Sequence, residues 1–123
     1  MPITINLSRE DVQAARVLPP GWYLCTIKDV WQEPAKSDGS TNTWVKFAVK
    51  EEGDFKDVPL RKNFSEKWMN PIIGLIEVLS GKAYVAGTPV ELDGAKGKDI
   101  RVQVQNKLYN GTAQNEVIGF KPA

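Results

Sequence analysis

The residue types most able to do chemistry in this sequence are aromatic and basic, and they gather around Trp44. In the run 43–50 apolar residues fill one parity, whereas the other parity carries Trp44, Lys46 and Lys50. Arg61 has the same outward parity on the strand expected next. Nucleic-acid bases stack on aromatic rings, and lysine and arginine neutralise the phosphates between them. The grouping therefore predicts a binding surface for single-stranded nucleic acid on the outer face of a sheet.

Five further residues are candidates for the same surface. Trp31, near the end of a long first strand, offers a second ring for stacking. In a small five-stranded barrel, two loops flank the binding face: the one between strands one and two, and the one between strands four and five. The first loop contains Lys36, the second has Lys107 and Tyr109 beside it, and the fourth strand carries Arg101 on its outward parity. The predicted nucleic-acid-binding residues are Trp31, Lys36, Trp44, Lys46, Lys50, Arg61, Arg101, Lys107 and Tyr109.

Each of these residues also has a purely structural interpretation. Trp44 can cover an apolar patch beneath an N-terminal helix, and Trp31 can pack at a barrel corner. Lysine and arginine on an exposed strand also serve solubility and protect sheet edges. Trp22 and Trp68 are interpreted as core or helix-packing residues. The alternative function is a protein–protein adaptor that docks a partner on an exposed aromatic sheet face.

Catalytic chemistry has little support in the sequence. There is no histidine and a single cysteine, Cys25, which excludes an intrachain disulfide, a Cys/His zinc site and a His-dependent nucleophilic triad. No phosphate-loop or dinucleotide glycine pattern occurs. The densest acidic group, residues 51–54, has the composition of a turn, although a carboxylate-metal enzyme stays as a third hypothesis. We expect no enzyme activity, cofactor or metal, and a buried, unreactive thiol at Cys25.

The composition describes an ordinary globular domain. The 123 residues are 41% hydrophobic and 25% charged, which is enough apolar material for one core. Sixteen basic against fifteen acidic residues give a net charge of +1, so any electrostatic attraction must come from one face. Neither a signal-peptide pattern nor a membrane-length apolar run is present, and we expect a cytoplasmic protein with no membrane partner.

Hydrophobic spacing predicts the elements that must position these residues. Alternation predicts strands, and three- to four-residue spacing predicts one principal amphipathic helix that has Pro71 near its start and Ser80-Gly81 at its end. The alternation of the first strand slips after Asp29, which predicts a β-bulge. Asn110-Gly111 predicts a two-residue hairpin turn. The expected elements are a short helix from Ser8 to about Val17, strands at 22–33, 43–50 and 58–64, the principal helix at 65–79, a turn of helix near 90–92, and strands from 100 to the hairpin turn and at 115–120.

This order predicts a mainly β fold with one principal helix. Three strands, a helix and a closing hairpin are the order of a five-stranded OB-type barrel, with its helix between strands three and four. Residues 1–20 are expected to form an N-terminal appendage with a short helix, and residues 21–123 the barrel domain.

Five short motifs follow one another between Leu18 and Pro122. They are Gly21-x-Tyr23-x-x-x-Ile27, Trp44-x-x-Phe47-x-Val49, Asn63-Phe64 at the entry to the helix, Gly97-Lys98-x-Ile100-x-Val102, and Tyr109-x-Gly111-x-x-x-Asn115-x-Val117. The series resembles a bacteriophage family of small OB-fold proteins that are regarded as single-stranded DNA-binding proteins and are found with recombination and replication functions. The resemblance implies non-sequence-specific binding of single-stranded DNA in phage replication or recombination, in the host cytoplasm. It leaves open whether the chain forms a homo-oligomer.

Overall fold

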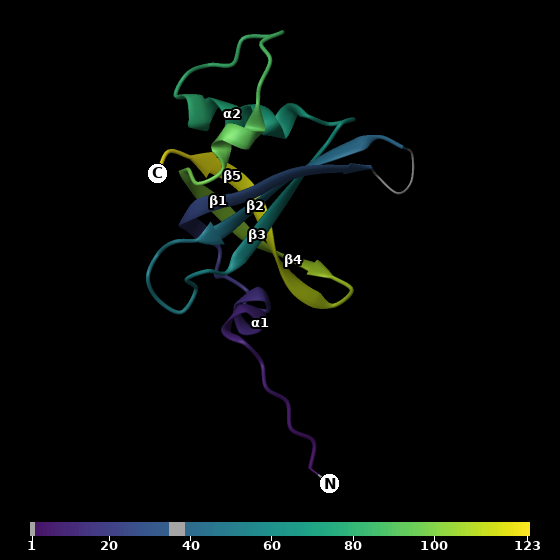
Figure 1. Cartoon of the computed structure of the whole chain (residues 1–123), viewed down its shortest axis with the longest axis vertical. Helices are drawn as coiled ribbons and strands as arrows, with labels where there is room; N and C mark the ends of the chain where they lie inside the picture. The colour runs from purple at the N-terminus through teal and green to yellow at the C-terminus, as the bar shows by residue number, and fades with distance from the viewer. Residues whose placement is uncertain (1, 35–38) are drawn as a thin grey trace.

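Five antiparallel strands and two α-helices make up the part of the chain that the computed structural model describes, residues 2–34 and 39–123 (Figure 1). None of the helices in these ranges is both long enough and apolar enough to cross a membrane. In chain order the elements are α1 (Arg9–Ala14), β1 (Gly21–Pro34), β2 (Thr41–Val49), β3 (Pro59–Ser65), α2 (Asn70–Ser80), a 3₁₀ turn (Leu92–Ala95), β4 (Asp99–Tyr109) and β5 (Thr112–Lys121).

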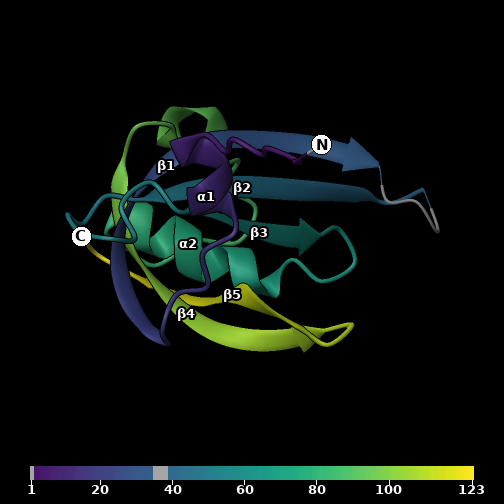
Figure 2. The same cartoon turned by 90° about the horizontal axis from the view of Figure 1, so that it is seen from below.

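The strands form one strongly curled sheet in the order β3-β2-β1-β4-β5. The long strand β1 joins its two halves, because residues 21–26 pair with β4 and residues 25–34 pair with β2. The curl brings the two outer strands, β3 and β5, into contact, although no ladder joins them in the described part of the chain (Figure 2). The predicted mainly β fold with five strands is confirmed, and the sheet is barrel-like but not closed.

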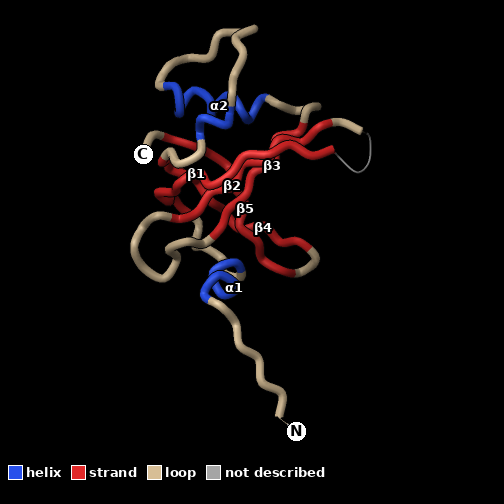
Figure 3. Tube along the Cα trace, viewed as in Figure 1, coloured by secondary structure: helices blue, strands red, loops and turns tan. Residues whose placement is uncertain are grey.

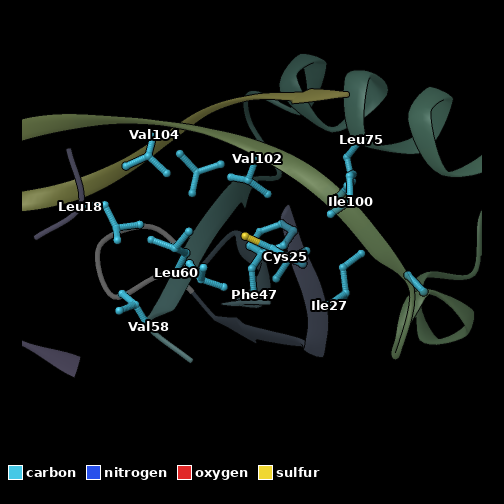
Figure 4. Close-up of a cluster of buried hydrophobic side chains, with 14 of the residues drawn as sticks. Leu18, Cys25, Ile27, Phe47, Val58, Leu60, Leu75, Ile100, Val102 and Val104 are labelled. Carbon is cyan, nitrogen blue, oxygen red and sulfur yellow. The ribbon is translucent and has the colours of Figure 1, made fainter. Parts of the chain in front are cut away.

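The inner face of this sheet holds the apolar core. On β2 the core residues are Val45, Phe47 and Val49, at every second position, as strand alternation requires. Leu75 of α2 closes one end of the core beside Ile100 (Figure 4). The remaining fully buried side chains include Leu18, Ile27, Val58, Leu60, Phe64, Val102, Val104 and Val117.

The segment before β1 closes the other end of the core. Leu18 has no exposed surface and lies near Val58, Leu60 and Val104 (Figure 4). Its backbone N–H donates to Asn115 Oδ1 at 2.8 Å, and its carbonyl accepts from Asn106 Nδ2 at 2.8 Å. These two asparagines lie opposite each other on β5 and β4. The N-terminal segment therefore contributes a core residue as well as a surface helix.

Helix α1 follows Ser8, as the sequence predicts, and Ser8 and Asp11 form a capping box at its start. It ends at Ala14, earlier than the expected Val17. The side-chain amide of Gln13, which is 3% exposed, donates to the carbonyls of Asp54 and Lys56 in the β2–β3 loop. These bonds hold α1 against that end of the sheet.

Helix α2 starts five residues later than the sequence predicts. Pro71 has no N–H to donate to a helical hydrogen bond, and only the first turn of a helix does not need one. Helix α2 therefore begins at Asn70, directly before Pro71. The preceding residues form a tight turn in which Trp68 N–H donates to the Ser65 carbonyl at 2.9 Å. The predicted end is confirmed, because Gly81 caps the helix with a φ of 75°. The expected helical turn near 90–92 lies slightly later, at Leu92–Ala95.

The predictions for Trp22 and Trp68 are wrong. Trp68 precedes α2 and so cannot share its buried face; the residue is 65% exposed. Trp22 is 37% exposed on the outer face of β1, where the Lys121 ammonium lies 4.4 Å from its ring centroid. Both rings are therefore open to contacts from outside the chain.

Cys25 gives a direct test of the core. The residue has no exposed surface, and burial together with the negative charge of Glu51 raises the pKa of its thiol to about 12. At pH 8 we expect the folded protein to resist labelling by a thiol reagent, whereas the urea-unfolded chain reacts at once. Mass spectrometry after timed labelling measures both rates. Rapid labelling of the folded protein would contradict the buried position of Cys25.

Candidate nucleic-acid interface

Trp31 and Trp44 lie directly opposite each other on β1 and β2. Their rings are parallel within 7°, and their centroids are 6.1 Å apart, within the range of offset-stacked pairs. Both residues are half-buried, so part of each remains open to solvent. The structure thus brings the two predicted stacking residues together.

A β-bulge decides that Trp31 faces outward. The register of β1 against β2 shifts between Ile27 and Asp29, so the extra residue of the bulge is Lys28. The sequence predicts the slip slightly later, after Asp29. A single inserted residue reverses the parity of every side chain that follows it. Before the bulge the odd positions, such as Ile27, are buried; after it Trp31 lies on the outer face.

The indole nitrogen of Trp44 has no hydrogen-bond partner among the described residues, although the atom itself is buried. A buried donor without an acceptor costs about 1–3 kcal/mol of stability. This cost offsets part of the stability that the half-buried ring gains by packing against Trp31.

Two cations lie next to the tryptophans and directly face each other. Lys46 on β2 is paired in register with Arg61 on β3, and like charges in that relation destabilise a sheet. Neither residue has an ion pair within residues 2–34 and 39–123. Asp29 is the register neighbour of Lys46 on β1, but its carboxylate binds Lys96 at 3.3 Å. A phosphate between Lys46 and Arg61 would relieve this repulsion.

A hollow of about 540 Å³ lies between α1 and this part of the sheet. Lys28, at the bulge, joins Lys46 and Arg61 in its wall, and α1 contributes Arg9, whose guanidinium lies 3.8 Å from Asp57. Four cationic and two acidic side chains line the hollow, so the balance of charge in its walls is positive. We call Lys28, Trp31, Trp44, Lys46 and Arg61 together the Trp44 face.

Lys50 has the predicted parity, but its charge is already neutralised. Its ammonium lies 2.5 Å from Asp99 Oδ2, and the Thr26 hydroxyl donates to Asp99 Oδ1 at 2.8 Å. The hydrogen bonds from Lys50 and then Thr26 hold the pKa of the Asp99 carboxyl below its usual value. Lys50 therefore ties the end of β2 to the start of β4 and contributes little positive charge to the Trp44 face.

Arg101 lies apart from the Trp44 face. It pairs in register with Leu24, on the half of β1 that precedes the bulge, and its guanidinium lies 4.0 Å from Glu51. Trp22 and Lys121 share this part of the outer surface. The fourth strand thus places Arg101 beside a second exposed tryptophan.

Lys107 and Tyr109 lie on the projecting β4–β5 hairpin (Figure 1). Lys107 is 3.5 Å from Glu116, and Tyr109 is 59% exposed next to the more exposed Leu108. Lys36, the remaining predicted residue, lies outside the described residues. Figure 2 shows the paired ends of β1 and β2 and the β4–β5 hairpin extending to the same side of the barrel.

Reasoning from the sequence missed Lys28 and Arg9. The signal for Lys28 was present, since it shares the polar parity of Thr26 just before the predicted bulge. Nothing in the sequence indicates that Arg9 would reach the same hollow, because α1 is placed there by contacts with residues 54–57.

Comparison with known proteins does not assign the chain to a family. No protein-family model matches the sequence, and a search of curated proteins finds no match.

Proposed function

We propose that this protein binds single-stranded DNA without sequence specificity and that its fold is an OB barrel. The strand order, the contact between β3 and β5, and the position of α2 between β3 and β4 support the OB assignment. In OB barrels the binding face lies over strands two and three, between the loop that follows strand one and the loop that follows strand four. Trp44 and Lys46 on β2 and Arg61 on β3 would contribute to such a face, and Lys28 and Trp31 extend it onto β1.

The observation that carries the proposal is the stacked pair of Trp31 and Trp44 beside the opposed cations Lys46 and Arg61. Stacking on tryptophan accepts every base, and the cations accept the backbone, so together they bind strands regardless of sequence. The cores of protein–protein interfaces are depleted in charged residues, whereas the Trp44 face holds the three cations Lys28, Lys46 and Arg61. The resemblance to the phage family favours DNA over RNA and a role in replication or recombination.

Tryptophan fluorescence tests the proposal directly. Titration with oligo-dT is expected to quench the emission, with an affinity that falls steeply as salt rises, because binding releases counterions from the phosphates. A Trp22→Phe/Trp68→Phe background removes the two exposed tryptophans outside the Trp44 face. Absence of quenching in that background, or quenching that is insensitive to salt, would refute the proposal.

Removing the charges of Lys46 and Arg61 should change the salt dependence of binding. For single strands the slope of log K against log salt becomes shallower by about 0.7 for each phosphate that the protein no longer neutralises. We expect that change for Lys46→Gln and for Arg61→Gln, and about 1.4 for the double variant. Fluorescence anisotropy with labelled oligo-dT at several salt concentrations measures the slope.

Lys82→Gln is the matched control for these variants. Lys82 lies just beyond α2, at the other end of the barrel from α1 (Figure 1). Its replacement removes the same charge and should leave the slope unchanged. Equal slopes for Lys46→Gln and Lys82→Gln would mean that the Trp44 face does not bind phosphates.

A further inference from the structure

Residues 2–7 form an extended arm whose apolar side chains are uncovered. Ile3, Ile5 and Leu7 are 90%, 76% and 65% exposed and alternate with Thr4 and Asn6. This alternation is typical of a strand that buries one face. The arm has no charged residue whose hydration would keep it in solvent. A contact with another surface would bury this apolar row and remove it from water.

The opposite end of the molecule carries an uncovered apolar groove. Two adjoining hollows of about 440 and 400 Å³ lie between α2 and the segment 82–92. Both are lined by Ile76, Tyr84, Val90 and Leu92. We call this the α2 groove.

Several apolar side chains that line the α2 groove are exposed. Val85 and Val90 are 69% and 41% exposed, and Ile73 of α2 is 38% exposed.

The two apolar surfaces cannot meet within one chain. Figures 1 and 3 show the arm leaving α1 away from the barrel, whereas α2 lies beyond the opposite end. Six extended residues reach about 20 Å, and the whole barrel lies between the arm and the groove. A second copy can bring its groove to the arm without any change in either fold.

We propose that residues 2–7 of one copy bind in the α2 groove of a second copy, so that copies associate head to tail. In this head-to-tail arrangement each contact joins two different surfaces and continues into a ring or a filament, whereas two copies that exchanged arms would stop at a dimer. A contact this small predicts weak association, with a dissociation constant on the order of micromolar or higher.

Sedimentation velocity over a wide range of protein concentration, without nucleic acid, tests this inference. We expect the unchanged protein to shift from monomer to larger species as concentration rises. Ile3→Glu/Ile5→Glu should remain monomeric, and so should Val85→Glu/Val90→Glu, in which only exposed groove residues change. Thr4→Glu/Asn6→Glu places the same charges on the polar parity of the arm and should associate more than the Ile3→Glu/Ile5→Glu variant.

Mixing the two defective variants separates an arm-to-groove contact from an arm-to-arm or groove-to-groove dimer. The groove variant keeps an intact arm and the arm variant keeps an intact groove, so an equal mixture should form species of twice the monomer mass and none larger. A monomeric unchanged protein, or association that survives in either variant, would overturn the inference. Because no nucleic acid is present, these outcomes are independent of the proposed DNA binding.

Discussion

Replacing Trp44 with alanine is expected to weaken binding of oligo-dT on the order of 5- to 150-fold, the equivalent of about 1–3 kcal/mol for one stacked base. Trp44 lies at the centre of the Trp44 face, with Trp31 opposite it on β1 and Asn63 opposite it on β3. Its replacement removes one ring and also the neighbour against which Trp31 is held parallel. Anisotropy titrations at fixed salt measure the change.

Two control variants separate stacking from folding. Trp44→Phe keeps an aromatic ring and removes the buried N–H that has no partner among the described residues, so its free energy of unfolding should equal or exceed that of the unchanged protein. It should retain more affinity than Trp44→Ala. Trp68→Ala removes an exposed tryptophan beside α2 and should bind oligo-dT normally. A Trp44→Ala variant that folds and binds as well as Trp68→Ala would exclude the Trp44 face as the binding site.

Replacing Leu18 with alanine is expected to lower the free energy of unfolding by about 2–5 kcal/mol. The side chain is fully buried, and hydrogen bonds from Asn106 and to Asn115 fix the backbone on both sides of it. The surrounding strands cannot collapse fully into the space left, so a cavity adds to the lost transfer energy. The free energy of unfolding of a typical domain is only about 5–15 kcal/mol, so this variant should unfold at a clearly lower urea concentration.

Val17→Ala is the matched control, because Val17 precedes Leu18 and is 41% exposed. Its replacement should change the free energy of unfolding by no more than about 0.5 kcal/mol, as expected for a surface position. Urea unfolding followed by circular dichroism compares the two variants. Equal decreases in stability would show that the segment before β1 does not contribute to the core.

Local patterns in the sequence predicted most of the fold. The inward positions of β2 follow from strict alternation, which depends only on strand geometry. Asn110 and Gly111 have φ values of 51° and 79°, and these two residue types accept positive φ readily, so the hairpin turn was visible in the sequence. Pro71 and Gly81 limit α2 for equally local reasons, although its start was placed too early. The bulge in β1 was also predicted, because it breaks an alternation that the sequence itself displays.

The candidate site was predicted in part. Trp31, Trp44, Lys46 and Arg61 come together as outward parity on neighbouring strands implies. The positions of Lys50 and Arg101 relative to them could not be predicted. Parity gives the side of a sheet, but it does not tell which acidic group lies within reach.

The sequence by itself determined which segments are strands and helices, and which side chains of each strand face the core, because these depend on neighbours a few residues away. The tertiary structure decided which outward residues meet and which charges remain unpaired. Lys50 is neutralised by Asp99, 49 residues later, and the backbone of Leu18 is held in the core by two asparagines 97 and 88 residues away. Such contacts follow from the register and curl of the whole sheet, which the burial of all its inner side chains sets together. The same long-range packing leaves Trp68 uncovered and brings Trp31 against Trp44.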